Sequence, residues 1–183
     1  MGNRLSGDVD LFTDWQRRGD FPRAVDAVIV AMESHDYRVA VVVRNETFAR
    51  LLLTDASRPD EEPEKLELSA DWRAHQPVLL SVGPVLHPDD AVANKMCALF
   101  GRAQPRDFLD VDAAIESGRY SRGRLLELAA AADAGFDRSL FAGAVGALQE
   151  ITDAAFDEYG IEPAELATMR RRFADWQTEL RSS

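Results

Sequence analysis

Cysteine, lysine and long apolar runs are scarce in this chain of 183 residues. The single cysteine, Cys97, excludes an intramolecular disulfide, so we expect a protein of the reducing cytoplasm. No apolar run approaches the roughly 20 residues that a membrane-spanning helix needs, so we expect no membrane partner. The motifs G-x-x-x-x-G-K-[ST], G-x-S-x-G and H-E-x-x-H are also absent, which argues against three common classes of enzyme.

The chain is acidic, with a formal net charge of -11 at pH 7. This charge argues against binding nucleic acid through the whole surface, although a local basic cleft is compatible with it. Only Lys65 and Lys95 are lysines among 21 basic residues. A lysine at an inner helical position, as at 95, therefore indicates a place that needs a compact ammonium group.

Hydrophobic spacing predicts a small mixed sheet followed by a helical half that packs on it, an α+β fold. Strands or extended segments are expected around residues 8–12, 38–43, 47–54, 65–68 and 76–86. Helices are expected at 21–33, 89–100, 106–116, 121–132, 138–159 and 163–180. We expect two domains, an α/β core at 1–86 and a helical region at 87–183.

Two carboxylates near the start, Asp8 and Asp10, flank an apolar residue in what we expect to be a short buried strand. Alternate strand residues share a face, so these carboxylates would lie roughly 6–7 Å apart. They repel one another unless a hard cation such as Mg²⁺ or Mn²⁺ lies between them. Ser6-Gly7 provides a flexible approach on which backbone can come close to a ligand. The alternative is an Asp-rich turn beside an edge strand.

Three short blocks of the sequence carry charged residues at fixed spacings. The first, Arg4-Leu5-Ser6-Gly7-Asp8-Val9-Asp10-Leu11-Phe12, fits the pattern R-x-S-x-D-h-D-L-F, in which h is apolar. Lys95-Met96-Cys97-Ala98-Leu99-Phe100-Gly101-Arg102 matches K-x-x-A-L-x-x-R, and Arg106-Asp107-Phe108-Leu109-Asp110 matches R-D-h-x-D. Together, these blocks resemble the patterns of the AbiEii/AbiGii-type nucleotidyltransferase toxins. The resemblance implies a polymerase-β-like core, divalent-metal chemistry, an NTP substrate, a tRNA 3′ end as acceptor and a cognate antitoxin.

Nucleotidyl transfer uses cations held by about three carboxylates, so the two acids near the start need a third. Glu67 is our choice, because the alternation Leu66-Glu67-Leu68 sends its side chain opposite to two core residues. Asp71 is the second candidate. The alternative for Glu67 is a solvent-facing strand residue.

Lys95 and Arg102 share a helix face and are expected to contact the triphosphate, lysine as a point charge and arginine as a fork. Asp107 and Asp110 lie at i and i+3 on the following helix and face the same way. The resemblance implies that Lys95 contacts the nucleotide and that Asp107 supports it, with Arg106 and Asp110 in supporting positions. The alternative is a surface lysine and an Arg106–Asp110 pair worth a few tenths of a kcal/mol.

One departure from the family pattern concerns the beginning of the sequence. The family normally carries a strand and a Gly-Ser turn before the paired acids, whereas only Met1-Gly2-Asn3 precedes Arg4 here. We therefore expect weak transferase activity, because backbone donors of this kind are commonly worth about 10²–10³ in rate. The alternative function is a catalytically impaired relative that acts as a binding or antitoxin-interacting module.

Two further groups are interpreted as structural. His35, His75 and His87 are scattered and lack metal-ligand spacing, so we expect them to be structural or exposed. Arg170-Arg171-Arg172 is interpreted as a solvated helix face, with contact to RNA phosphates as the alternative.

Overall fold

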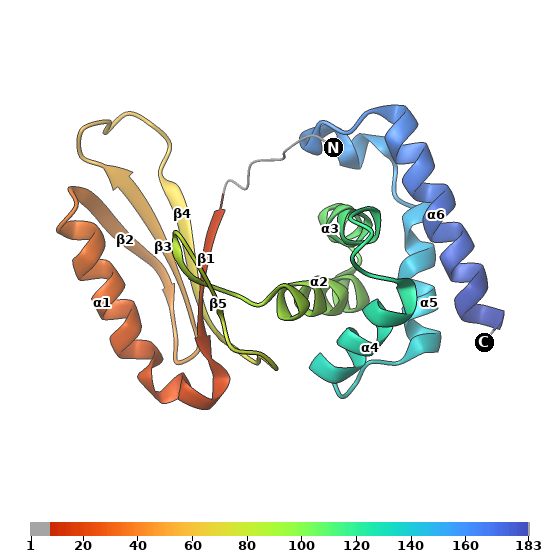
Figure 1. Cartoon of the computed structure of the whole chain (residues 1–183). Coiled ribbons are helices and arrows are strands. Elements are labelled where there is room, and N and C mark those ends of the chain that lie inside the picture. Colours follow the sequence, from red (N-terminus) through yellow and green to blue (C-terminus); the bar gives the residue numbers. More distant parts are fainter. Residues whose placement is uncertain (1–7, 183) are drawn as a thin grey trace. The chain divides into compact units, whose positions relative to one another are not determined.

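The computed structural model describes residues 8–182, and the chain divides into two compact units, Met1–Arg73 and Ala74–Ser183. The first unit contains a four-stranded sheet and the second is mostly helical (Figure 1). The predicted α+β fold with a helical C-terminal half is therefore confirmed. The two units meet after Arg73, earlier than the domain boundary that we expected at residue 86. The extent of the two domains stays a prediction. Within residues 8–182, no helix has both the length and the apolarity to cross a membrane.

The first unit is a mixed sheet with one long helix. Its elements are β1 (Asp8–Asp14), the 3-10 helix η1 (Trp15–Asp20), α1 (Phe21–Glu33), β2 (Tyr37–Arg44), β3 (Phe48–Asp55) and β4 (Glu64–Asp71). The strand order is β1-β4-β3-β2, and β1 is parallel to β4 while the other pairs are antiparallel. Helix α1 has a proline in its first turn, as expected from the sequence, and lies along one face of the sheet (Figure 1).

Period-2 alternation in β3 and β4 makes the core of this unit. Buried and less buried residues alternate along both strands, as half-covered strands require. The buried side chains are Phe21 and Val25 of α1, Ala49, Leu51 and Leu53 of β3, and Leu66 and Leu68 of β4. Because α1 covers this face, the residues between the buried ones in β4 lie on the opposite face.

The expectation of a buried first strand is wrong. Val9, Leu11 and Phe12 are 57%, 38% and 37% exposed. The reason is position: β1 lies at one end of the strand order, and among the described residues the core around α1 draws on β3 and β4 but not on β1. Apolar composition therefore predicted the strand and not its burial.

The second unit begins with a short hairpin, β5 (Val78–Leu80) and β6 (Gly83–Val85). The helices that follow are α2 (Pro88–Arg102), α3 (Pro105–Glu116), α4 (Arg122–Ala132), α5 (Arg138–Gly146), the 3-10 helices η2 (Ala147–Gln149) and η3 (Asp153–Tyr159), and α6 (Pro163–Ser182). Their shared core contains Met96, Phe108, Phe141 and Trp176, all fully buried. Each predicted helix is present except one.

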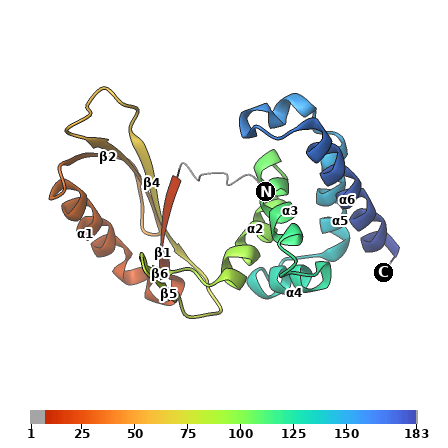
Figure 2. The ribbon, with the colours of Figure 1, turned by 45° about the horizontal axis from the view of Figure 1, so that its top comes forward.

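The helix predicted over residues 138–159 is broken into α5, η2 and η3. Arg170 of α6 donates hydrogen bonds to the carbonyl oxygens of Leu148 and Ile151, which a continuing helix would use for its own amides. The close approach of α5 to α6, visible in Figure 2, also depends on Gly146. A Cβ at that position would lie 1.8 Å from Nε2 of Gln177.

Candidate functional site

A row of charged residues crosses three strands of the first unit. The register pairs Asp10 of β1 with Glu67 of β4, and Glu67 with Arg50 of β3. Directly paired residues on neighbouring strands are about 4.8 Å apart and share a face. That face is the one opposite to buried Leu66 and Leu68, as expected for Glu67 from the alternation. We call Asp10, Glu67 and Arg50 the acid row.

The carboxylate of Glu67 is partly open and carries two cationic neighbours. Its side chain is 23% exposed, and its Oε1 accepts hydrogen bonds from Nε and Nη2 of Arg50 at 2.7 and 2.6 Å. Nζ of Lys65 lies 3.8 Å from the same oxygen. Both cations approach one carboxylate oxygen, so the pairing does not use all the lone pairs of the group.

The register separates the two candidates for the third carboxylate. Glu67 is opposite Asp10, whereas Asp71 is opposite Asp14, four positions farther along the same strands. Four strand residues span about 13 Å, too far for a side chain of that length to share a cation with Asp10. Asp8 stands two residues before Asp10 in the backbone and pairs with Lys65, while its side chain and Ser6 lie outside the described residues.

The second group of predicted residues gathers where α2 meets α3. Nε and Nη2 of Arg102 donate to the two carboxylate oxygens of Asp107 at 2.9 and 2.7 Å. Asp107 is 1% exposed, and it also accepts a hydrogen bond from the backbone N–H of Gln104 at 3.0 Å, which caps α3. The hydrogen bond with Asp107 raises the pKa of Arg102 above its usual value. This pair therefore fixes the corner between the helices.

Lys95 and Asp110 form a second ion pair at this corner, with Nζ and Oδ2 2.9 Å apart. Asp110 of α3 thus pairs with Lys95 of the preceding helix. Lys95 remains half-exposed, so its ammonium is accessible to an anionic ligand. Arg106 is exposed on α3.

Two arginines of the run Arg170-Arg171-Arg172 on α6 do not form a solvated face. Arg170 is 18% exposed and binds the carbonyl oxygens near η2 together with Asp153. Arg172 contacts Asp112 of α3 and, at 2.6 Å, Glu116. The interpretation from sequence is wrong for these two residues, because their guanidinium groups join α6 to the rest of the helical unit.

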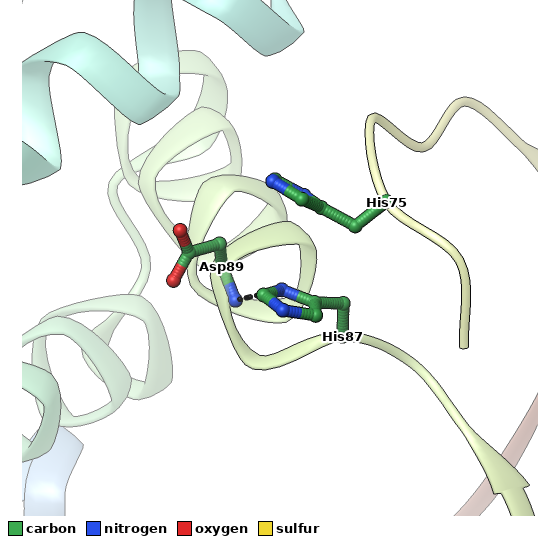
Figure 3. A group of neighbouring side chains, drawn as sticks. All are labelled: His75, His87 and Asp89. Carbon is green, nitrogen blue, oxygen red and sulfur yellow. Dashed lines mark hydrogen bonds between the residues drawn. The ribbon is translucent and has the colours of Figure 1, made fainter. Parts of the chain in front are cut away.

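Sequence reasoning missed a pair of histidines. His75 and His87 stack with ring centroids 4.3 Å apart and an interplanar angle of 19°, and Asp89 lies beside them (Figure 3). The β5–β6 hairpin separates the two histidines in sequence, so their spacing gave no signal. The observation that they come together corrects the expectation that the histidines are scattered.

The model of one protein family, described as "Nucleotidyl transferase AbiEii toxin, Type IV TA system", matches residues 1–182. The chain belongs to the AbiEii family. Among solved structures, it is similar to JHP933 from Helicobacter pylori, with 16% sequence identity over 98% of this chain and 79% of that chain, and a TM-score of 0.52. It is also similar to a proposed nucleotidyltransferase from H. pylori, with 15% identity, 97% and 82% coverage, and a TM-score of 0.45. No curated protein matches it.

Membership of the AbiEii family confirms the resemblance seen in the sequence blocks and makes this chain a nucleotidyltransferase-type toxin. The likeness to JHP933 supports the fold alone, because the identity is low. The acid row belongs to the first unit of this AbiEii chain, and the pairs Lys95–Asp110 and Arg102–Asp107 belong to the second. That the acid row and these two ion pairs serve one cleft stays a prediction.

Proposed function

We propose that this AbiEii-family toxin transfers a nucleotidyl group from an NTP to the 3′ end of tRNA, with Mg²⁺ or Mn²⁺ held by Asp8, Asp10 and Glu67. The observation that supports the proposal most directly is the register that sets Asp10 opposite Glu67 on the open face of the sheet. Two acids adjacent on neighbouring strands form the kind of oxygen site that a hard divalent cation prefers.

The residues on this face fit such a cation. An ionised carboxylate has about four lone-pair sites, and the contacts of Glu67 with Arg50 and Lys65 are on Oε1. Arg50 can therefore keep Glu67 oriented while the carboxylate binds a cation. When bound, Mg²⁺ lowers the pKa of the attacking hydroxyl and offsets charge on the leaving pyrophosphate.

In the helical unit, Lys95 and Arg102 are proposed to bind the phosphates of the NTP. Asp107 holds the guanidinium of Arg102 through two hydrogen bonds, so Arg102 presents a fixed fork of remaining donors. Asp110 positions the Lys95 ammonium in a similar but more exposed pair. Ser6 and Arg106 are proposed as a further nucleotide contact and a supporting residue.

The proposed partners follow from the family. A family of type IV toxin–antitoxin systems supports a cognate antitoxin as the protein partner. The net charge of -11 means that a tRNA acceptor must be bound through a small local surface. We therefore expect weak non-specific RNA binding even if transfer to tRNA is efficient.

The test is transfer of label from α-labelled NTPs to total tRNA in the presence of Mg²⁺ or Mn²⁺. Asp10→Asn should abolish transfer, and Asp71→Asn is the matched control, since the register places Asp71 four positions farther along the strands from Asp10. Transfer that survives Asp10→Asn, or falls equally in both variants, would contradict the proposal.

A second candidate function is a non-catalytic binding module, and one observation favours it. Glu67, Lys95 and Arg102 are each already paired with an opposite charge within their own unit. Calorimetry with Mg²⁺–NTP separates the two candidates. Nucleotide binding with label transfer supports the enzyme, and binding of a co-expressed antitoxin with neither nucleotide binding nor transfer supports the module.

A further inference from the structure

The stacked histidines and Asp89 offer three metal-ligand atoms within 4.8 Å of one another. His75 precedes β5, while His87 and Asp89 stand at the start of α2 (Figure 3). All three residues are partly buried, and none belongs to the residues proposed for nucleotidyl transfer. Two imidazoles and one carboxylate are a ligand set typical of Zn²⁺ and of other first-row divalent metals.

His75 is held by a buried carboxylate in the way that metal-binding histidines usually are. Its Nδ1 lies 3.0 Å from Oδ1 of Asp90, which is 3% exposed. Asp90 also accepts the backbone N–H groups of Ala74 and His75 at 3.1 and 3.0 Å. The acceptor places the ring proton on Nδ1 of His75 and leaves the lone pair on Nε2, which is the form that binds a metal.

His87 lies at the N-terminus of α2, beside Asp89. Its Nδ1 accepts the backbone N–H of Asp89 at 3.2 Å, and a metal bound by His87 would replace this hydrogen bond. The stacking keeps the two rings side by side, with centroids 4.3 Å apart.

The carboxylate of Asp89 accepts one hydrogen bond on each oxygen. Tyr120 Oη donates to Oδ1 at 3.1 Å and Nη2 of Arg124 to Oδ2 at 2.8 Å. Each oxygen keeps a second lone pair, and outer hydrogen bonds of this kind commonly orient a ligating carboxylate.

We propose that His75, His87 and Asp89 bind one first-row divalent transition-metal ion, with Zn²⁺ as the probe. Imidazole lone pairs lie in the ring plane, so the stacked rings do not yet aim at one point. Binding therefore requires the His87 ring to turn out of the stack, which brings ligand atoms now within 4.8 Å to the roughly 3.3 Å spacing of tetrahedral zinc. Three protein ligands leave one position for water. The bound ion would join the segment before β5 to the start of α2, and so close the hairpin into a fixed loop.

The experiment is a titration of the chelator-treated full chain with Zn²⁺, and with Co²⁺ followed by its visible absorption. We expect one equivalent to bind, a rise in Tm, and slower proteolysis within residues 76–86. His75→Asn and His87→Asn should each weaken Zn²⁺ binding by about 100-fold or more, beyond the 10–100-fold expected for an outer-shell residue.

The matched control is His35→Asn, since His35 is an exposed histidine of the first unit whose Nδ1 contacts the carbonyl oxygen of Ala31. It should bind Zn²⁺ as the wild type does. Absence of saturable binding by the wild type, or unchanged binding in both His75→Asn and His87→Asn, would overturn the proposal. Circular dichroism checks that each variant is folded. The result is independent of nucleotidyl transfer, which is measured with Mg²⁺ and depends on Asp10.

Discussion

Glu67 of the sheet and Asp107 of the helical unit are both carboxylates paired with an arginine, but their surroundings differ. Glu67 is 23% exposed and its contacts with Arg50 and Lys65 are on one oxygen. Asp107 is 1% exposed, and its two oxygens are used by Arg102 and by the backbone of Gln104. A carboxylate with open lone pairs suits ligand binding, whereas a saturated one suits the positioning of a neighbour.

The largest effect on stability is expected from Asp107→Ala. The change removes the partner of Arg102 and the cap of α3, and should lower the free energy of unfolding by about 2–4 kcal/mol. Urea unfolding followed by circular dichroism measures it. Asp110→Asn is the control, because it breaks a more exposed pair and should cost about 1 kcal/mol or less. An equal loss of stability in the two variants would contradict the larger structural role of Asp107.

Glu67→Gln should behave in the opposite way, with a large effect on activity and a small one on stability. Loss of one charged metal ligand is expected to reduce transfer to tRNA by about 10²–10³-fold. The half-exposed pair with Arg50 should contribute about 1 kcal/mol or less to stability. The measurements are initial rates of label transfer and the urea midpoint of unfolding. A Glu67→Gln protein that loses much of its stability but keeps the wild-type specific activity would reverse the comparison.

Lys95→Met is expected to have a moderate effect confined to nucleotide binding. A charged hydrogen bond is worth about 1.5–3 kcal/mol, so the KM for NTP should rise by about tenfold or more. Stability should change by less than about 1 kcal/mol, because the pair with Asp110 is exposed. An unchanged KM would show that Lys95 serves the corner between α2 and α3 and not the nucleotide.

The smallest expected effect is on pH dependence. Arg124 and Tyr120 lower the pKa of Asp89, so Asp89 stabilises the fold above its unfolded value of 3.8, and this contribution is lost as pH falls through the folded pKa. Burial raises the pKa of Asp112 instead, so its contribution falls as pH rises above 3.8. Metal-free Asp89→Asn should therefore lose less stability than the wild type between pH 5 and acid conditions, as measured by thermal unfolding. A steeper loss of stability in this variant at acid pH would contradict a lowered pKa of Asp89.

Much of the fold was accessible from sequence because local chemistry decided it. The alternation Leu66-Glu67-Leu68 required one covered face, and the structure provides it with α1. Three sequence blocks predicted the family, and family membership is confirmed. The Pro22 at the start of α1 and the acids of α2 likewise marked helix starts.

What the sequence did not reveal depends on contacts between distant segments. The break after α5 comes from Arg170, a residue about 20 positions away that takes carbonyl groups the helix would need. The stacking of His75 on His87 depends on a hairpin that returns the chain to its starting point. The exposure of β1 depends on its place in the strand order. None of these features leaves a periodic signal.

The most direct test is Mn²⁺ binding to the sheet acids, followed by electron paramagnetic resonance in a His75→Asn background that removes the histidine cluster. We predict one saturable Mn²⁺ site that is lost in Asp10→Asn and in Glu67→Gln and is kept in Asp71→Asn. Binding that is unaffected by Glu67→Gln, or equally lost in Asp71→Asn, would contradict a cation site built on the Asp10–Glu67 register.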